Sequence, residues 1–206
     1  MKSGSALLAV ALVAALASMV ACSSSSSKTP TTCDPSCQDD VAVRGLRDAV
    51  KLAFNLLLQG QPVGTQDTMV VPCPLGGMVQ VHGTATSVAE QGTTMLTDLT
   101  YDFEACGYSE TDTDPTKTFS LTLTGSVVEN GNLANDPSST TAITLDSDAL
   151  SITGTVFSPG IQYGLADGGA ESCSVHLGQN GDDVSGTVCA PADAGADAGR
   201  MVGVSL

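Results

Sequence analysis

The chain has 206 residues, of which 22 are acidic and seven are Lys or Arg, giving a formal net charge of −15 at pH 7. A polyanion of this size repels nucleic acid and anionic lipid surfaces, so we expect neither as a partner. The chain has no Trp, three Tyr and four Phe, which argues against the aromatic platforms of sugar and single-stranded nucleic-acid sites.

The first feature along the chain is an apolar run, residues 6–20, preceded by Lys2. A run of about 15 residues is shorter than the roughly 20 that a membrane-spanning helix needs, but it suits a signal peptide. A spanning anchor is the weaker interpretation, because no positive charge follows the run before Lys28. Ordinary secretion, with cleavage after residues 15–17 (Ala-Leu-Ala), leaves Cys22 as an odd thiol in the exported protein.

A second interpretation, which we favour, starts from residues 19–22, which read Met-Val-Ala-Cys and are followed by five serines, residues 23–27. This segment resembles the signal peptides of bacterial lipoproteins, whose lipobox ends in a cysteine; Met19 stands where Leu is usual. The resemblance implies that Cys22 receives a diacylglyceryl group and becomes a fatty-acylated N-terminus that anchors the protein in a membrane. Because Ser23 follows where an Asp would favour inner-membrane retention, the resemblance also implies the outer membrane or the cell surface.

These features divide the chain into four parts. Residues 1–21 are the predicted signal peptide, and 22–32 are a lipidated, flexible, Ser-rich stalk. Residues 33–190 form a single disulfide-stapled, β-rich domain with strands from about residue 68, and 191–206 are a low-complexity Asp/Ala/Gly tail that is predicted to be disordered. The stalk and the Asp-Ala-Gly repeats also resemble those of uncharacterised bacterial surface lipoproteins, a likeness that implies no activity.

A helix is predicted at the start of the domain. Asp34 is a possible N-cap with Pro35 at the first helical position, and Ser36 is the alternative start. Apolar residues then recur with helical spacing, which predicts an amphipathic helix over about 36–58 that packs on the protein's own sheet. The predicted apolar stripe comprises Ala42, Leu46, Ala49, Val50, Ala53, Leu56 and Leu57. The predicted polar stripe comprises Asp40, Arg44, Arg47, Asp48, Lys51 and Asn55.

After the helix the pattern changes to the two-residue alternation of β-strands. Residues 78–88 and 94–105 are predicted to form a hairpin around residues 90–92 (Glu-Gln-Gly). One face of its second arm is predicted to comprise Met95, Leu99, Tyr101 and Phe103. Residues 119–127 and 143–156 continue the alternation. The sequence therefore predicts an α+β, mainly β fold: an antiparallel meander sheet, a sandwich or a half-barrel, with the N-terminal helix packed on it.

Apart from Cys22, six cysteines remain, an even number that in an oxidising compartment favours three disulfides over thiol chemistry or zinc. Cys173 and Cys189 lie symmetrically about Gly181 in a predicted hairpin. Pairing about that centre sets the two cysteines opposite each other, within disulfide reach, and sets Val175 opposite Thr187. We therefore predict a Cys173–Cys189 bond.

The other pairings follow from position along the chain. Cys73 lies just before the first hairpin and Cys106 just after it, so they are predicted to pair. Cys33 and Cys37 remain and would close a small loop.

The chemistry-bearing residues do not form a catalytic pattern. His82 and His176 each stand alone on a predicted strand, which is typical of solvated surface residues, and zinc is disfavoured. We find no nucleophile elbow, phosphate-binding loop or dinucleotide fingerprint. Acidic loops such as residues 112–114 and 182–183 offer oxygen ligands to calcium, but none matches the 12-residue calcium loop, and turn chemistry explains them more simply. We therefore expect no cofactor and no enzymatic activity.

We interpret the chain as a membrane-tethered, non-enzymatic lipoprotein of the bacterial envelope, with a structural or protein-interaction role. The alternative is a periplasmic or surface lipoprotein that binds a small ligand, in which the strands curl into a half-barrel and the helix acts as a plug. A continuous apolar cavity between helix and sheet favours this carrier, whereas a fully packed core opposes it.

Overall fold

The structure, a computed structural model, describes residues 32–58, 68–136, 138–165, 172–189 and 199–206. These residues form one α-helix, α1 (Pro35–Leu58), and nine strands. The strands are β1 (Met69–Pro72), β2 (Met78–Val88), β3 (Thr93–Glu110), β4 (Phe119–Ala134), β5 (Ala142–Val156), β6 (Ile161–Gly164), β7 (Cys173–Asn180), β8 (Asp183–Val188) and β9 (Arg200–Ser205). The predicted signal peptide, the lipid-attachment residue Cys22 and nearly all of the stalk lie outside the described residues.

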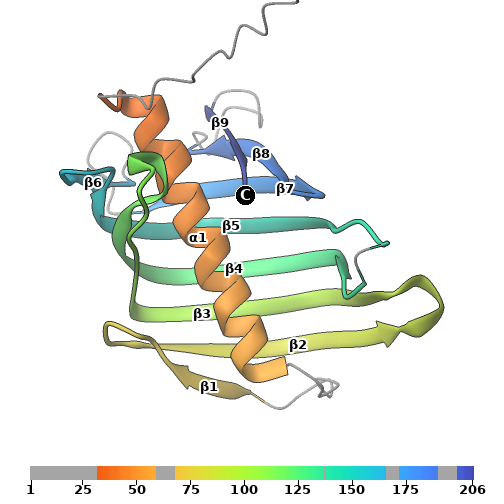
Figure 1. The fold of residues 1–206 in the computed structure, drawn as a ribbon. Helices are drawn as coiled ribbons and strands as arrows, with labels where there is room; N and C mark the ends of the chain where they lie inside the picture. Colours follow the sequence, from red (N-terminus) through yellow and green to blue (C-terminus); the bar gives the residue numbers. More distant parts are fainter. Residues whose placement is uncertain (1–31, 59–67, 137, 166–171, 190–198) are drawn as a thin grey trace, which may run out of the picture.

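All nine strands belong to one open antiparallel sheet (Figure 1). The strand order is β1-β2-β3-β4-β5-β7-β8-β9, and the short strand β6 pairs with the end of β5 that β7 leaves uncovered. Neighbours in sequence are therefore neighbours in space, as in a meander. The mainly β, antiparallel prediction is confirmed, whereas a sandwich or a half-barrel is not.

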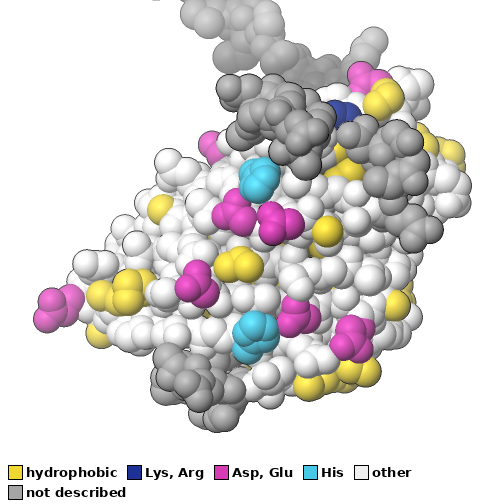
Figure 2. Space-filling model, turned by 180° about the vertical axis from the view of Figure 1, so that it is seen from behind, with side chains coloured by type: hydrophobic (Ala, Val, Ile, Leu, Met, Phe, Trp, Pro, Cys, Tyr) yellow, Lys and Arg dark blue, Asp and Glu magenta, His cyan; other side chains and the backbone are white. Residues whose placement is uncertain are grey.

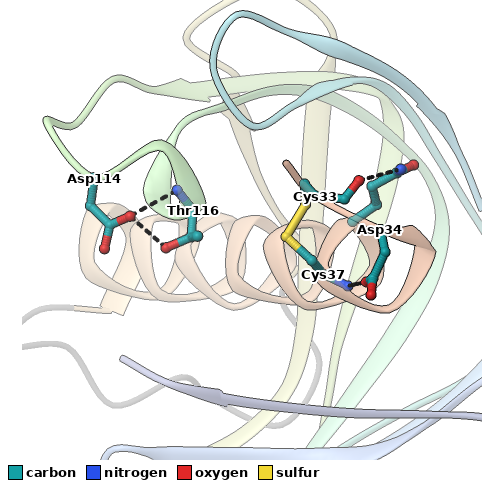
Figure 3. The surroundings of a disulfide bond; sticks show 6 residues. Cys33, Asp34, Cys37, Asp114 and Thr116 are labelled. Atoms are coloured by element: carbon teal, nitrogen blue, oxygen red, sulfur yellow. Dashed lines mark hydrogen bonds between the residues drawn. A yellow bond between two sulfur atoms is a disulfide. The ribbon is translucent and has the colours of Figure 1, made fainter. Parts of the chain in front are cut away.

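The helix starts where the sequence predicts. The Asp34 side chain accepts a hydrogen bond from the Cys37 backbone N–H at 2.9 Å, and Pro35 is the first helical residue (Figure 3). The side-chain amide of Gln38 donates to the Cys33 carbonyl at 3.1 Å. The first of these bonds satisfies a backbone N–H that the helix N-terminus leaves without an intrahelical partner.

The helix lies across one face of the sheet (Figure 1). Its buried residues include Leu46 and Val50, and Gly45 allows a close approach, because a Cβ there would lie 2.6 Å from the Leu121 side chain on β4. Two residues differ from the predicted stripes. Arg47, expected on the polar face, is 3% exposed, and Leu56, expected on the apolar face, is 59% exposed. The polarity of a helix face thus changes along its length.

The strands show the predicted alternation between the points where their pairing shifts, and the first shift in β3 changes one predicted face. Leu99, Tyr101 and Phe103 are buried as expected, but Leu96 is buried and Met95 is 43% exposed. The pairing of β3 with β4 shifts between Leu96 and Leu99, where Asp98 has a φ of 48°. An extra residue in a strand reverses which side chains face inward, so the expectation for Met95 was wrong.

The three predicted cysteine pairings are confirmed. The Cα atoms are 5.2 Å apart in Cys33–Cys37 and 5.4 Å apart in Cys73–Cys106. In Cys173–Cys189 they are 4.6 Å apart. Each value lies within the range that a disulfide spans.

The hairpin register used to predict the third bond was wrong by one residue. Val175 pairs with Val188, and Thr187 pairs with His176. In this register Cys189 would face away from Cys173 if β8 continued regularly. Cys189 instead has a φ of 54°, which breaks the alternation and brings its side chain to the same face.

Residues 200–205, placed by the sequence in the low-complexity tail, form the edge strand β9. Side chains of α1 bind its backbone: Asp40 accepts from the Gly203 N–H at 3.0 Å, and Arg44 donates to the Ser205 carbonyl. The buried Asp39 carboxylate also accepts two hydrogen bonds from Arg200. The contacts of Asp40 and Arg44 cover backbone groups that an edge strand otherwise exposes.

Candidate ligand-binding groove

A groove of about 1240 Å³ lies between the C-terminal half of α1 and the sheet. The helix contributes Arg47, Lys51, Phe54 and Asn55 to its lining. The sheet contributes residues near the β2–β3, β4–β5 and β7–β8 turns, among them Ala85, Ser87, Thr94, Glu129, Leu133 and Gln179. The groove therefore lies on the side of α1 that faces these turns in Figure 1. Its lining mixes apolar, hydroxyl, amide and charged side chains.

Two buried charged residues, Arg47 and Glu129, lie at the floor of the groove. The Arg47 side chain is 4% exposed and that of Glu129 is 1% exposed, and the Arg47 terminal nitrogen Nη1 lies 3.9 Å from Glu129 Oε1. Arg47 Nε donates to the side-chain carbonyl of Gln179 at 2.5 Å, and the Tyr101 hydroxyl donates to Glu129 Oε2 at 2.7 Å. The four side chains come from α1, β3, β4 and β7, so the whole fold is needed to assemble them.

Burial shapes the protonation of this cluster. Desolvation raises the pKa of Glu129, and the Arg47 charge and the Tyr101 hydrogen bond offset part of that rise. Desolvation, followed by the Glu129 charge, raises the pKa of Tyr101 well above its usual value of 10. Tyr101 therefore remains a neutral phenol at physiological pH and acts as a hydrogen-bond donor.

Several polar atoms of the cluster have no hydrogen-bond partner among the described residues. Glu129 Oε1 is buried and accepts no hydrogen bond. The only side-chain hydrogen bond of Arg47 in the described chain uses Nε, which leaves both terminal nitrogens without an acceptor. The Arg47–Glu129 separation of 3.9 Å is an ion-pair contact, since it exceeds the usual N–H···O distance by about 1 Å. Buried polar atoms are normally paired, so Glu129 Oε1 requires a ligand, a water molecule or a functional explanation.

The rim of the groove is also charged. Lys51 and Asn55 follow Arg47 on the helix at intervals of four residues, which places them on the same side. Across the groove lie Asp136 and Asp182. Backbone and side-chain hydrogen bonds from Ser138 lower the pKa of Asp136, so this carboxylate is ionised at neutral pH.

The two histidines lie elsewhere, on the sheet face opposite α1. Each is half-exposed and contacts an aspartate on the neighbouring strand. His82 Nε2 is 3.0 Å from Asp102, and His176 Nδ1 is 3.1 Å from Asp146. Figure 2 shows both beside acidic side chains on that face. The structure thus brings neither histidine to the groove.

The acidic loop at residues 112–114, which was considered for calcium, uses its carboxylates in local hydrogen bonds. Asp112 accepts from the Asp114 backbone N–H, and Asp114 accepts from the backbone and hydroxyl of Thr116 (Figure 3). No group of three or more His, Cys, Asp or Glu positioned to hold a metal ion occurs among the described residues.

Sequence reasoning missed the groove residues. Glu129 carried a usable signal, because extending the β4 alternation from Val127 by one period places residue 129 on the inner face. The signal for a buried Arg47 was weaker, and it came from the neighbouring Leu46 and Val50 on the buried side of α1. Nothing local marked Tyr101 or Gln179 as their partners.

No family model matches the chain, and neither the curated proteins nor the solved structures with which it was compared include a match. None of the helical structure in the described ranges is both long and apolar enough to cross a membrane.

Proposed function

We propose that the protein is an exported, lipid-anchored protein of the bacterial envelope that binds a small ligand in the groove between α1 and the sheet. In this proposal the curved sheet acts as a half-barrel and α1 as its plug. The observation that supports it most strongly is the buried floor of the groove, where Arg47 and Glu129 offer hydrogen-bonding atoms that the described residues leave unused.

Energetics favour a functional role for this floor. Burying a charged pair costs several kcal/mol per ion, and well-packed apolar residues of similar volume are often equally or more stabilising. Arg47 and Glu129 are therefore poorly explained as stabilising residues alone. A ligand that supplies the missing hydrogen bonds recovers part of the desolvation cost on binding.

The groove changes the ranking of the two sequence-based hypotheses. A fully packed core opposes a carrier, and the space between helix and sheet is not fully packed. The lining differs from the expected apolar cavity, because charged and hydroxyl groups occur beside Phe54 and Leu133. We therefore propose a ligand with polar groups in place of a purely apolar one.

Three disulfides support the proposed location, since they persist in oxidising compartments such as the periplasm and cell surface. Attachment through an acylated Cys22 is part of the same proposal. Binding is favoured over catalysis, because the described residues that line the groove include neither His nor Cys, the usual bases and nucleophiles of covalent catalysis.

A protein-interaction role is a second proposal, supported by a different surface. Val70, Leu75 and Met78, near the β1 edge of the sheet, are 55%, 59% and 40% exposed. Apolar side chains gathered at an unpaired sheet edge are typical of protein contacts. The groove and this edge are separate, so the two roles are compatible.

Native mass spectrometry of full-length protein purified from envelopes without denaturation tests the ligand-binding proposal. Ser87→Trp places a bulky ring in the groove, and Thr86→Trp places the same ring on the opposite face of β2. We expect a bound small-molecule mass on the wild type and on T86W, and its loss from S87W. Equal occupancy of the two variants, or no bound mass on the wild type, would contradict the proposal.

A further inference from the structure

The floor of the groove offers donors and an acceptor side by side. The terminal nitrogens of Arg47 donate, and Glu129 Oε1, 3.9 Å away, accepts. The remaining polar atoms of both side chains are held by Gln179 and Tyr101, which fixes their orientation. A ligand group that satisfies this floor must therefore contain an acceptor next to a donor.

Charge restricts the ligand further. The charges of Arg47 and Glu129 are opposite and close together. An anionic ligand is attracted by Arg47 and repelled by Glu129, and a cationic ligand is attracted by Glu129 and repelled by Arg47. Over longer distances the net charge of −15 repels anions from the whole molecule. An uncharged group avoids both repulsions and still uses both hydrogen-bonding partners.

Two uncharged groups combine adjacent donors and acceptors: amides and the hydroxyls of sugars. Sugar sites rely on stacking against aromatic faces, and Phe54 is the only aromatic residue among those that line the groove in the described chain. Alanine and leucine side chains, Ala85 and Leu133, provide the apolar walls instead. This lining fits short aliphatic side chains on an amide backbone better than it fits a sugar ring.

We propose that the groove binds an uncharged, amide-bearing ligand of short-peptide size, which Arg47 and Glu129 recognise together. The ligand carbonyl accepts from an Arg47 terminal nitrogen, and its N–H donates to Glu129 Oε1. The volume of about 1240 Å³ exceeds that of a typical single small-molecule pocket, which agrees with several linked amides. This inference rests on the proposed ligand-binding function and specifies the class of ligand.

Three alanine tripeptides that differ only in their ends test this inference by calorimetry. The neutral one is acetylated and amidated, the cationic one is only amidated, and the anionic one is only acetylated. We expect the neutral peptide to bind at least about tenfold more tightly than either charged peptide, in line with hydrogen bonds to charged partners. Equal or tighter binding of a charged peptide would overturn the inference.

A neutral trisaccharide, maltotriose, serves as the fourth ligand in the same titration. Binding tighter than that of the neutral peptide would overturn the assignment to amides in favour of sugars. If none of the four ligands binds while native mass spectrometry still finds a groove-dependent bound mass, the inference fails and the proposed function stands. If the bound mass is insensitive to S87W, the proposed function itself fails.

The variant Glu129→Gln tests the role of the charge pair. It keeps the size of the side chain and an acceptor for Tyr101, but it leaves the Arg47 charge uncompensated. We expect E129Q to bind the anionic peptide more tightly than the neutral one, which reverses the wild-type order. Glu104→Gln, the same change on the exposed opposite face, should preserve that order. If folded E129Q still binds the neutral peptide more tightly than the anionic one, the inference is contradicted. The peptide affinities of the wild type test the inference even if E129Q does not fold.

Discussion

The two halves of α1 differ in how they contact the rest of the molecule. The N-terminal half carries the Cys33–Cys37 disulfide and is fixed by hydrogen bonds to β6 and β9, which Asp39 and Asp40 accept and Arg44 donates. The C-terminal half lines the groove, and it ends with Leu56 exposed to solvent. A helix held firmly at one end can leave space under the other, so one element both stabilises the fold and shapes a site.

The largest expected difference between the halves concerns two leucines ten positions apart. Leu46 is fully buried against the sheet, and Leu56 is 59% exposed. Leu46→Ala should lower the free energy of unfolding by about 3 kcal/mol, because it removes buried methyl groups and leaves a cavity. Leu56→Ala should change it by less than about 0.5 kcal/mol. Urea denaturation measures both, and similar losses would contradict the proposed contrast.

A smaller loss is expected from Asp39, which links the fixed half of α1 to two strands. Its carboxylate accepts from the Tyr163 hydroxyl at 2.8 Å and from Arg200 Nε at 2.7 Å. Asp39→Ala should lower the free energy of unfolding by about 2 kcal/mol, since Tyr163 loses its acceptor while half-exposed Arg200 can turn to water. The matched control is the exposed Asp183→Ala, which should lose less than about 0.5 kcal/mol. Equal losses of unfolding free energy in the two variants would contradict a role of Asp39 in fixing the N-terminal half of α1.

The smallest expected effect concerns Asp48, in the middle of the helix. Desolvation, together with the neighbouring Glu110, raises the pKa of Asp48 from 3.8 to about 6. The folded state thus binds the proton more tightly than the unfolded state, and this group makes stability fall as pH rises from about 4 to about 6.

Asp48→Asn removes that penalty. Allowing for partial solvent screening, we expect a gain of about 1 kcal/mol at pH 7 that disappears below about pH 4. Thermal unfolding of both proteins across this pH range checks the prediction. A gain that is independent of pH would show that the carboxylate is not its source.

The local features of this fold could be predicted from the sequence. The helix start at Asp34, the hairpin of β2 and β3 and the three disulfides depend on residues close in the chain or on simple alternation. The errors arose where one residue interrupted the alternation of inward and outward side chains. Asp98 in β3 and Cys189 after β8 are these residues, and both have positive φ angles. Side-chain patterns do not reveal such backbone conformations when the residue is not glycine.

The long-range features could not be predicted. Strand β9 follows a low-complexity stretch and depends on pairing with β8 and on helix side chains more than 160 positions away. The buried position of Arg47 depends on Gln179, 132 positions along the chain, and on Glu129. Charged residues are rarely buried without partners, and the sequence alone does not identify which partner a helix residue will meet.

Nuclear magnetic resonance titration with the acetylated and amidated alanine tripeptide tests the central proposal most directly. We expect the side-chain Nε–H signal of Arg47 and the backbone amides of Asn55, Leu133 and Gln179 to shift in a saturable manner. The amides of His82 and His176, on the opposite face, should stay unchanged. Shifts confined to that opposite face, or no saturable shift in the groove, would contradict the recognition of an uncharged amide ligand between α1 and the sheet.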